Sequence, residues 1–159
     1  LPIVYNSNGY DSVEVLRLLD GIVDIYLPDF KFAEARAALY LSRIPDYPER
    51  TKEAISEMYR QVGRLQTDAN GIARRGLIVR HLVLPGNMAW TDQVLEWLAD
   101  LDPDLDISLM GQYFPAHRAP YTNGLDRRLT WDEYDAACRH AEKLGLTNVR
   151  TQKLFLFSA

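Results

Sequence analysis

Short apolar runs alternate along the chain with segments whose apolar residues recur every three or four positions. The runs are rich in β-branched and aromatic residues and predict strands at residues 3–5, 22–27, 77–84 and 107–114. The helical spacing predicts helices over about ten residues from position 11, and over 33–42, 49–62, 91–101 and a segment after position 130.

Polar residues at the predicted helix starts fit capping positions. Asp11 with Glu14, and Thr130 with Glu133, have the spacing of a capping box, and Thr91 is expected to cap the helix that it precedes. These signals predict helix starts at Asp11, Thr91 and Thr130.

An Asn-Gly pair at residues 70–71 lies between two strand-like segments. This pair is the favoured signal for a tight hairpin, so residues 65–67 are expected to fold back on the strand that follows and to project from the surface. Residues 150–157 are interpreted as a last extended segment.

Strands that alternate with helices at this spacing predict an α/β fold of about four β/α units with a parallel sheet, because parallel neighbours need crossover connections. The nearly continuous apolar strand 77–84 predicts burial on both faces. Length and composition fit a single domain over residues 1–159. Polar clusters follow the strands at residues 6–10, 29–31, 80–87 and 112–117, which predicts a functional rim at the strands' carboxyl ends.

Asp29 and Lys31 are two residues apart, so in extended backbone both side chains point to the same face. Arg80 and Leu82 share one face of their strand, while His81 points to the other. The desolvated Arg80 guanidinium needs a carboxylate partner, either a protein one such as Asp29 or that of a ligand. Two interpretations therefore remain for each position. Asp29 and Lys31 form either an ion pair at the rim or part of a ligand site, and Arg80 belongs either to a structural ion pair in the core or to a ligand site.

Composition narrows the function classes. The formal net charge of −4 argues against a nucleic-acid partner, which normally meets a basic face. No apolar run approaches the roughly 20 residues needed to span a membrane, so the cytoplasm is the expected compartment. Cys138 is the one cysteine, which excludes an internal disulfide, and it is expected to be a buried structural thiol. His81 and His117 belong to no short metal-ligand motif.

Four segments together resemble rim motifs of radical S-adenosylmethionine (radical SAM) proteins of the pyruvate formate-lyase-activating branch. They are YNSNGY at 5–10, LPDFK at 27–31, RHLVLPGN at 80–87 and MGQY at 110–113. The resemblance implies the C-terminal part of a partial (β/α)6, TIM-like barrel, with S-adenosylmethionine bound to a 4Fe-4S cluster across the strands' carboxyl ends. In activating enzymes, reductive cleavage of this cofactor gives a radical that takes hydrogen from a glycine of a partner enzyme.

The resemblance also implies roles for individual residues. Asn6 and Ser7 correspond to positions near the methionine part of the cofactor, and Asp29 and Lys31 to positions near its carboxylate and sulfonium. Arg80 and Leu82 correspond to cofactor-facing positions. Tyr113 and His117 correspond to the adenosine end.

The family holds its cluster with a Cys-x3-Cys-x2-Cys loop, which this sequence lacks. The chain is therefore expected to be the C-terminal part of a barrel, inactive alone, without the cluster-binding part. Its partner is expected to be a glycyl-radical enzyme or another protein substrate, and the apolar first strand is expected to promote self-association. The alternatives are a non-catalytic β/α protein-binding module and a conventional β/α-barrel enzyme; for the latter no phosphate loop or acid-base pair is found.

Overall fold

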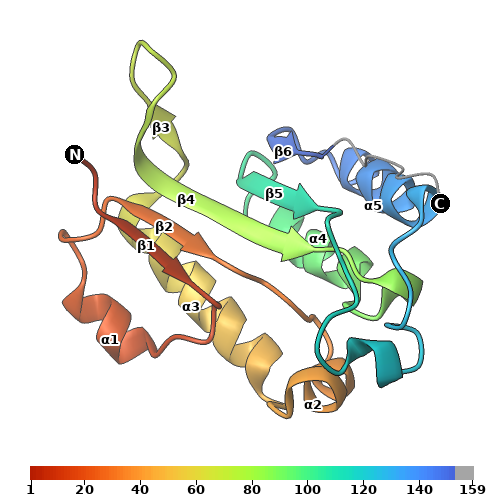
Figure 1. The fold of residues 1–159 in the computed structure, drawn as a ribbon. Coiled ribbons are helices and arrows are strands. Elements are labelled where there is room, and N and C mark those ends of the chain that lie inside the picture. The colour runs from red at the N-terminus through yellow and green to blue at the C-terminus, as the bar shows by residue number, and fades with distance from the viewer. Residues whose placement is uncertain (153–159) are drawn as a thin grey trace.

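A computed structural model describes residues 1–152. Its centre is a parallel sheet in the order β1-β2-β4-β5-β6, and a short strand, β3, pairs antiparallel with β4 (Figure 1). The strands are β1 (Val4–Ser7), β2 (Ile25–Pro28), β3 (Gln66–Thr67), β4 (Ala73–Leu82), β5 (Asp106–Met110) and β6 (Val149–Arg150). The predicted α/β fold with a parallel sheet is confirmed.

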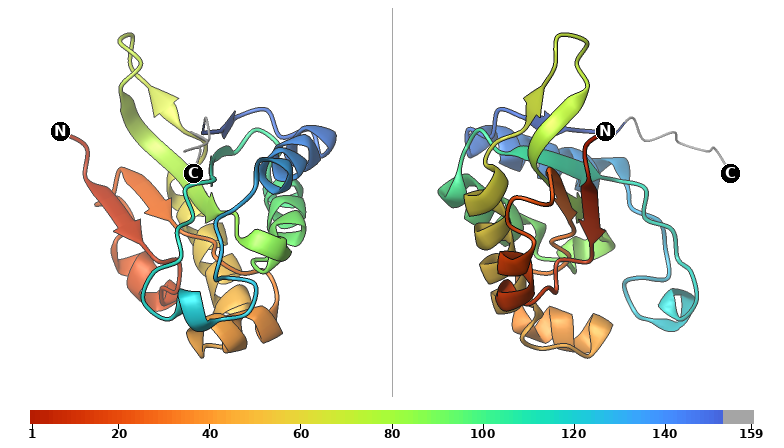
Figure 2. Two further views of the ribbon diagram at one scale, coloured as in Figure 1. Left: turned by 45° about the vertical axis from the view of Figure 1, so that its right-hand side comes forward. Right: turned by 90° about the vertical axis from the view of Figure 1, so that its left-hand side faces the viewer.

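Helices cover one side of this sheet. The α-helices are α1 (Val13–Leu18), α2 (Ala35–Ser42), α3 (Tyr47–Val62), α4 (Thr91–Leu101) and α5 (Trp131–Lys143), and the 3-10 turns are η1 (Pro85–Asn87) and η2 (Ala119–Tyr121). α1, α3 and α4 lie behind the strands, and the segment that carries η2 curls in front of the sheet's other face (Figures 1 and 2).

Burial alternates along the strands because successive side chains point to opposite faces. Along β4, Leu77, Val79 and His81 are buried against the helices, whereas Ile78, Arg80 and Leu82 are partly exposed. The prediction that this strand is buried on both faces was wrong. Within the described residues its second face has no helix layer, and this half-exposed surface is called the open face below.

Pro28 interrupts the backbone pairing between β2 and β4 in the middle of the sheet. Pro28 pairs with Ser7 of β1, so β2 extends one residue beyond the predicted end. The ladder between β2 and β4 has no pair at Leu27 or Pro28 and resumes as a single bridge between Asp29 and Arg80. A proline nitrogen cannot donate, so the interruption falls where the donor is missing.

Two predicted caps are wrong by one residue. Ser12, not Asp11, caps α1, since its hydroxyl accepts from Val15 N. Trp90 is the N-cap residue of α4, and Thr91 is the first helical residue. Thr91 is buried and its hydroxyl is bound to His81, which leaves it unavailable as a cap.

Two further local predictions are confirmed, whereas α1 has six residues rather than about ten and β2 begins at Ile25 rather than at position 22. Thr130 and Glu133 form the predicted capping box at α5, and the turn at residues 68–72 joins β3 to β4 in a projecting hairpin (Figure 1). β5 ends at Met110, short of the predicted position 114. Of the predicted last extended segment, Arg150 lies in β6, and residues 153–157 lie outside the described residues.

Among the helices of residues 1–152, none combines the length and the apolar character that crossing a membrane requires.

Candidate functional site

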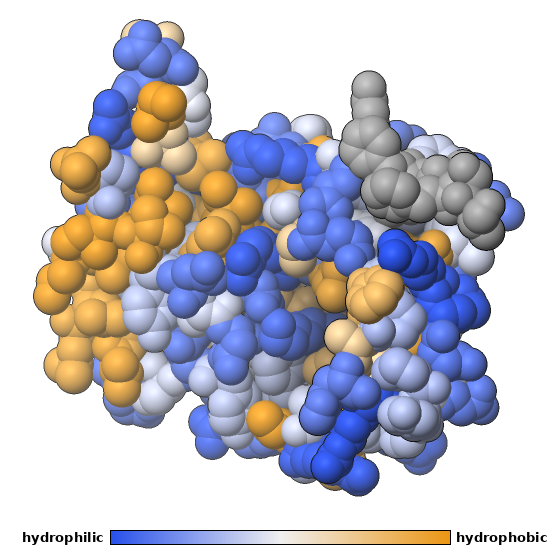
Figure 3. Space-filling view, in the orientation of Figure 1, coloured by the Kyte–Doolittle hydropathy of each residue, from blue (hydrophilic) through white to orange (hydrophobic). Residues whose placement is uncertain are grey.

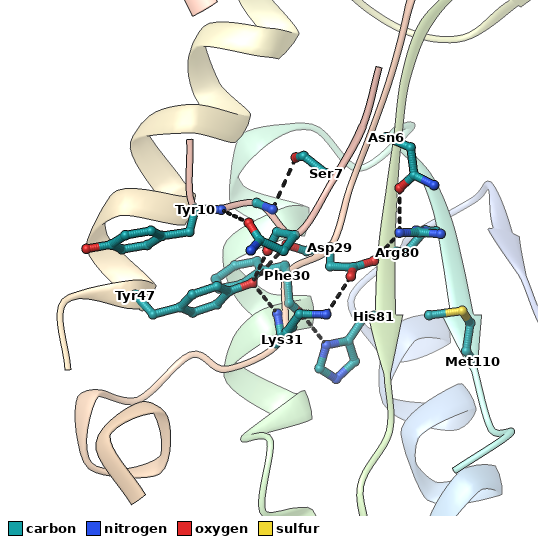
Figure 4. Close-up of polar contacts among 12 residues, drawn as sticks. Asn6, Ser7, Tyr10, Asp29, Phe30, Lys31, Tyr47, Arg80, His81 and Met110 are labelled. Atoms are coloured by element: carbon teal, nitrogen blue, oxygen red, sulfur yellow. Dashed lines mark hydrogen bonds and ion pairs between the residues drawn. The ribbon is translucent and has the colours of Figure 1, made fainter. Parts of the chain in front are cut away.

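A charged cluster lies on the open face of the sheet, where β2 and β4 approach their carboxyl ends. Arg80 Nη2 is 2.7 Å from Asp29 Oδ1 and donates to Asn6 Oδ1, also at 2.7 Å. Lys31 Nζ is 2.5 Å from the second carboxylate oxygen of Asp29. Figure 4 shows the four side chains converging from three neighbouring segments of the chain. They are called the rim cluster below.

Backbone pairing brings Asp29 and Arg80 together. They are opposite each other in an isolated parallel bridge, and Phe30 N donates to Arg80 O at 2.8 Å. Asn6 lies on β1, two residues beyond Val4 in a register that pairs Val4 with Ile25. Period-two alternation then directs Asn6, Asp29 and Arg80 to the same face.

The loop after β1 packs directly on the backbone of Asp29. Gly9 has a φ of +81°, and a Cβ built there would lie 2.1 Å from the Asp29 carbonyl oxygen. Only glycine permits this approach.

The buried side chain of Tyr47 fixes the same region. Its hydroxyl accepts from Lys31 N at 3.0 Å and lies within donating distance of the carbonyl oxygens of Asn8, at 2.8 Å, and Asp29, at 2.9 Å. Burial raises the pKa of Tyr47 to about 12, so the hydroxyl keeps its proton. Asp29 and Lys31 are therefore held by neighbours on both sides.

The rim cluster has donor capacity that its own contacts do not use. It contains two cations and one carboxylate, so it carries a formal excess of one positive charge. Arg80 Nε is buried and has no hydrogen-bond partner among the described residues. A buried donor without a partner costs about 1–3 kcal/mol, which favours a ligand that brings an acceptor.

His81 lies on the opposite face from Arg80, as predicted. It is fully buried, with Nδ1 2.6 Å from Phe30 O and Nε2 2.9 Å from Thr91 Oγ1. Desolvation lowers its pKa to about 4, so the ring is neutral near pH 7. His81 thus joins β4 to α4 and to the segment after β2, and does not reach the rim cluster.

Leu82 and Met110 supply an apolar floor beside the cluster. They pair in the register of β4 and β5, and both are half-buried on the open face. Leu82 was predicted to face a ligand with Arg80, and the shared face is confirmed. Met110 was not singled out as a site residue, although it pairs with Leu82 and ends its strand.

Three other predicted site residues lie apart from these contacts. Ser7 donates to Asp11 Oδ2 at 2.6 Å and accepts from Gly9 N, within the β1–α1 loop. Tyr113 donates to Leu125 O at 2.7 Å, and His117 is exposed. No hydrogen bond within residues 1–152 links any of the three to the rim cluster.

Gly9 and Tyr47 also belong to the site. Gly9 lies in the predicted rim segment 6–10, but its contact with Asp29 was not predicted, and Tyr47 was missed because it precedes a helix-start proline without any pattern that points to the sheet. Their contacts join segments up to 39 residues apart, so no local spacing could reveal them.

Within residues 1–152, no group of three or more His, Cys, Asp or Glu side chains is placed to hold a metal ion. Cys138 is half-buried in α5, and burial raises the pKa of its thiol. The cysteine is therefore less buried than predicted.

The fold and the site define an α/β protein whose parallel sheet carries a charged cluster on its open face. No family model matches the chain. The chain is similar to an uncharacterized protein of Methanocaldococcus jannaschii, MJ0674, with 31% identity over 147 residues. The similar region covers 92% of this chain and 39% of that protein, so the chain spans about two-fifths of the length of this relative.

Proposed function

We propose that this chain is the part of a radical SAM enzyme that holds the amino-acid end of S-adenosylmethionine. The observation that carries the proposal is the rim cluster: Arg80, Asp29, Lys31 and Asn6 converge on the open face, at the carboxyl ends of parallel strands. In β/α folds this end of the sheet is where ligands bind.

The chemistry of the rim cluster fits a zwitterionic α-amino acid group. Arg80 and Lys31 are donors suited to a carboxylate, and a guanidinium can bind one through two parallel hydrogen bonds. Asp29 Oδ1 and Asn6 Oδ1 are acceptors suited to an ammonium group. The buried Arg80 Nε is a donor still without a partner in the described residues.

The proposed enzyme also needs a 4Fe-4S cluster. When bound, it supplies the electron that cleaves S-adenosylmethionine reductively. Three thiolates are required, and the sequence has Cys138 alone, which is half-buried. The proposal therefore requires a Cys-x3-Cys-x2-Cys loop outside the 159 residues.

In the proposed enzyme, the residues of this chain bind and orient. Arg80 and Lys31 hold the carboxylate of S-adenosylmethionine, and Asp29 keeps both cations in position. Leu82 and Met110 provide an apolar surface beside them. The substrate proposed is a glycine of a partner protein, as in activating enzymes. This part of the proposal rests on the resemblance of the rim motifs.

The test uses the full-length protein that contains this chain, reconstituted with iron and sulfide. Calorimetry measures S-adenosylmethionine binding, and chromatography measures 5'-deoxyadenosine formed under reducing conditions. We expect Arg80→Met to weaken binding about tenfold or more, because a charge-assisted, partly desolvated contact is lost. Arg17→Met removes an exposed guanidinium from α1 and should leave binding unchanged.

Two results would overturn the proposal. One is a full-length sequence without the three-cysteine loop, and the other is the absence of binding heat with a protein that carries its cluster.

The second candidate is a non-catalytic module that recognises a protein through the same face. The specific observation in its favour is the set of half-exposed apolar side chains on the open face: Leu27, Ile78, Leu82 and Met110. Binding of S-adenosylmethionine distinguishes the two candidates, since the module predicts none.

A further inference from the structure

A separate cavity of about 450 Å³ lies on the helix side of the sheet, between α4 and α5 and beside η1. Its apolar lining includes Val83, Ala136 and Ala137, and its polar lining includes Asp92, Glu133 and His140. The two helices run next to each other in Figures 1 and 2. The volume is within the range of about 300–1,000 Å³ that is typical of small-molecule sites.

Glu133 forms a fixed wall of this cavity. Its carboxylate accepts from Arg127 Nη1 and Nη2 at 2.8 and 2.7 Å and from Gly86 N at 2.8 Å, and it closes the capping box with Thr130. The Arg127 guanidinium, as the largest cause, lowers the pKa of Glu133 far below its usual value. Because Arg127 balances the charge of Glu133, we assign this carboxylate a structural role in the cavity wall.

Asp92 keeps acceptor capacity, and His140 lies beside it in the lining. Asp92 Oδ1 accepts from Asn87 Nδ2 at 2.8 Å, and no described residue donates to Asp92 Oδ2. His140 Nε2 is buried without a hydrogen-bond partner among the described residues; the Glu96 carboxylate, at 3.6 Å, is too distant for one. Both side chains line the cavity.

The charged side chains that line the cavity are negative. It contains two carboxylates, and no lysine or arginine lines it. The apolar walls favour an apolar body, and Asp92, whose Oδ2 has no donor and which has no cation partner among the described residues, favours a positively charged donor.

We propose that this cavity binds a small molecule with a compact apolar body and a protonated primary amine. The ammonium group donates to Asp92 Oδ2, and the apolar body packs against Ala136, Ala137 and Val83. This site is separate from the rim cluster and does not depend on the function proposed for it.

The experiment titrates the isotope-labelled protein with benzylamine, benzyl alcohol and benzoate, and follows amide NMR shifts. These probes share one apolar body and differ in charge. We expect saturable shifts at Asp92, Ala136 and His140 with benzylamine, weaker binding of benzyl alcohol and none of benzoate.

Two variants test the location. Ala136 is exposed at the cavity wall, so Ala136→Leu should fill the entrance without disturbing the core and lower benzylamine affinity about tenfold or more. Asp92→Asn should lower it to a similar extent by removing the charge. Ala69→Leu, in the exposed hairpin turn, adds the same side chain elsewhere and should have no effect.

The proposal is overturned if benzoate binds as well as benzylamine, if the shifts fail to saturate, or if Ala136→Leu binds benzylamine as the unaltered protein does.

Discussion

Arg80 and Asp29 are joined twice, once through the backbone and once through their side chains. They are opposite each other in a parallel bridge, and Nη2 is 2.7 Å from Oδ1. Pro28 interrupts the ladder immediately before this bridge. The ion pair therefore lies where regular pairing of β2 with β4 has ended and side chains take part in holding the two segments together.

We expect the two side chains to be energetically coupled. Arg80→Met and Asp29→Asn should each lower the free energy of unfolding, and the double variant should lose less than their sum, with a coupling of about 1 kcal/mol for a partly buried pair. Urea unfolding of the four proteins measures the coupling. Strictly additive effects would show that the two contacts are independent.

His81 should make stability depend on pH. Its folded-state pKa, about 4, is below the ordinary value of 6.5, so the neutral ring is favoured in the folded state. The stabilisation is complete above pH 6.5 and is lost as the pH falls from 6.5 to 4, because only the unfolded state takes up the proton. A shift of this size corresponds to about 3 kcal/mol.

The measurement for His81 is urea unfolding across this pH range. His81→Gln should flatten the dependence, whereas His117→Gln, which alters an exposed histidine, should retain it. Equal slopes for His81→Gln and the unaltered protein would contradict the prediction.

Gly9 should tolerate no side chain. Gly9→Ala places a methyl group against the Asp29 carbonyl and keeps an unfavourable φ, so we expect a loss of about 3 kcal/mol of unfolding free energy. Gly21→Ala is the matched control: its φ is +78°, but nothing lies within 4 Å of the added Cβ. Its loss should be near 1 kcal/mol. Similar losses for both would show that the close approach is not decisive.

We propose that the chain self-associates through β1, which is an edge strand of the sheet among the described residues. Ile3 and Val4 are exposed there, Val15 and Leu18 are exposed on α1, and Figure 3 shows a broad apolar surface on this side of the molecule. An apolar edge strand without charge invites pairing with another chain.

Val4→Lys should lower the average mass measured by light scattering at high concentration, since a charge on the edge opposes pairing. Ile72→Lys, at an exposed position in the hairpin, should not. A monomer at every concentration for the unaltered protein would refute the proposal.

The sequence predicted the regular parts of the fold because their signals are local. Period-two and helical spacing gave the order of strands and helices, and the Thr130–Glu133 pair marked a helix start correctly. Thr91 was wrongly predicted to be an N-cap because its hydroxyl is hydrogen-bonded to His81, which lies on another element. The two caps look alike in sequence and differ only in their tertiary neighbours.

The same division holds for the candidate site. Sequence spacing by itself determined that Asp29 and Lys31 share a face, and that Arg80 and His81 point to opposite faces, because side-chain direction in extended backbone alternates with a fixed period. Only the tertiary structure decided that Asn6 and Asp29 both reach Arg80, and that Gly9 and Tyr47 hold the Asp29 backbone. Those contacts depend on strand register and on how loops cross, which arise from packing between segments far apart in the chain.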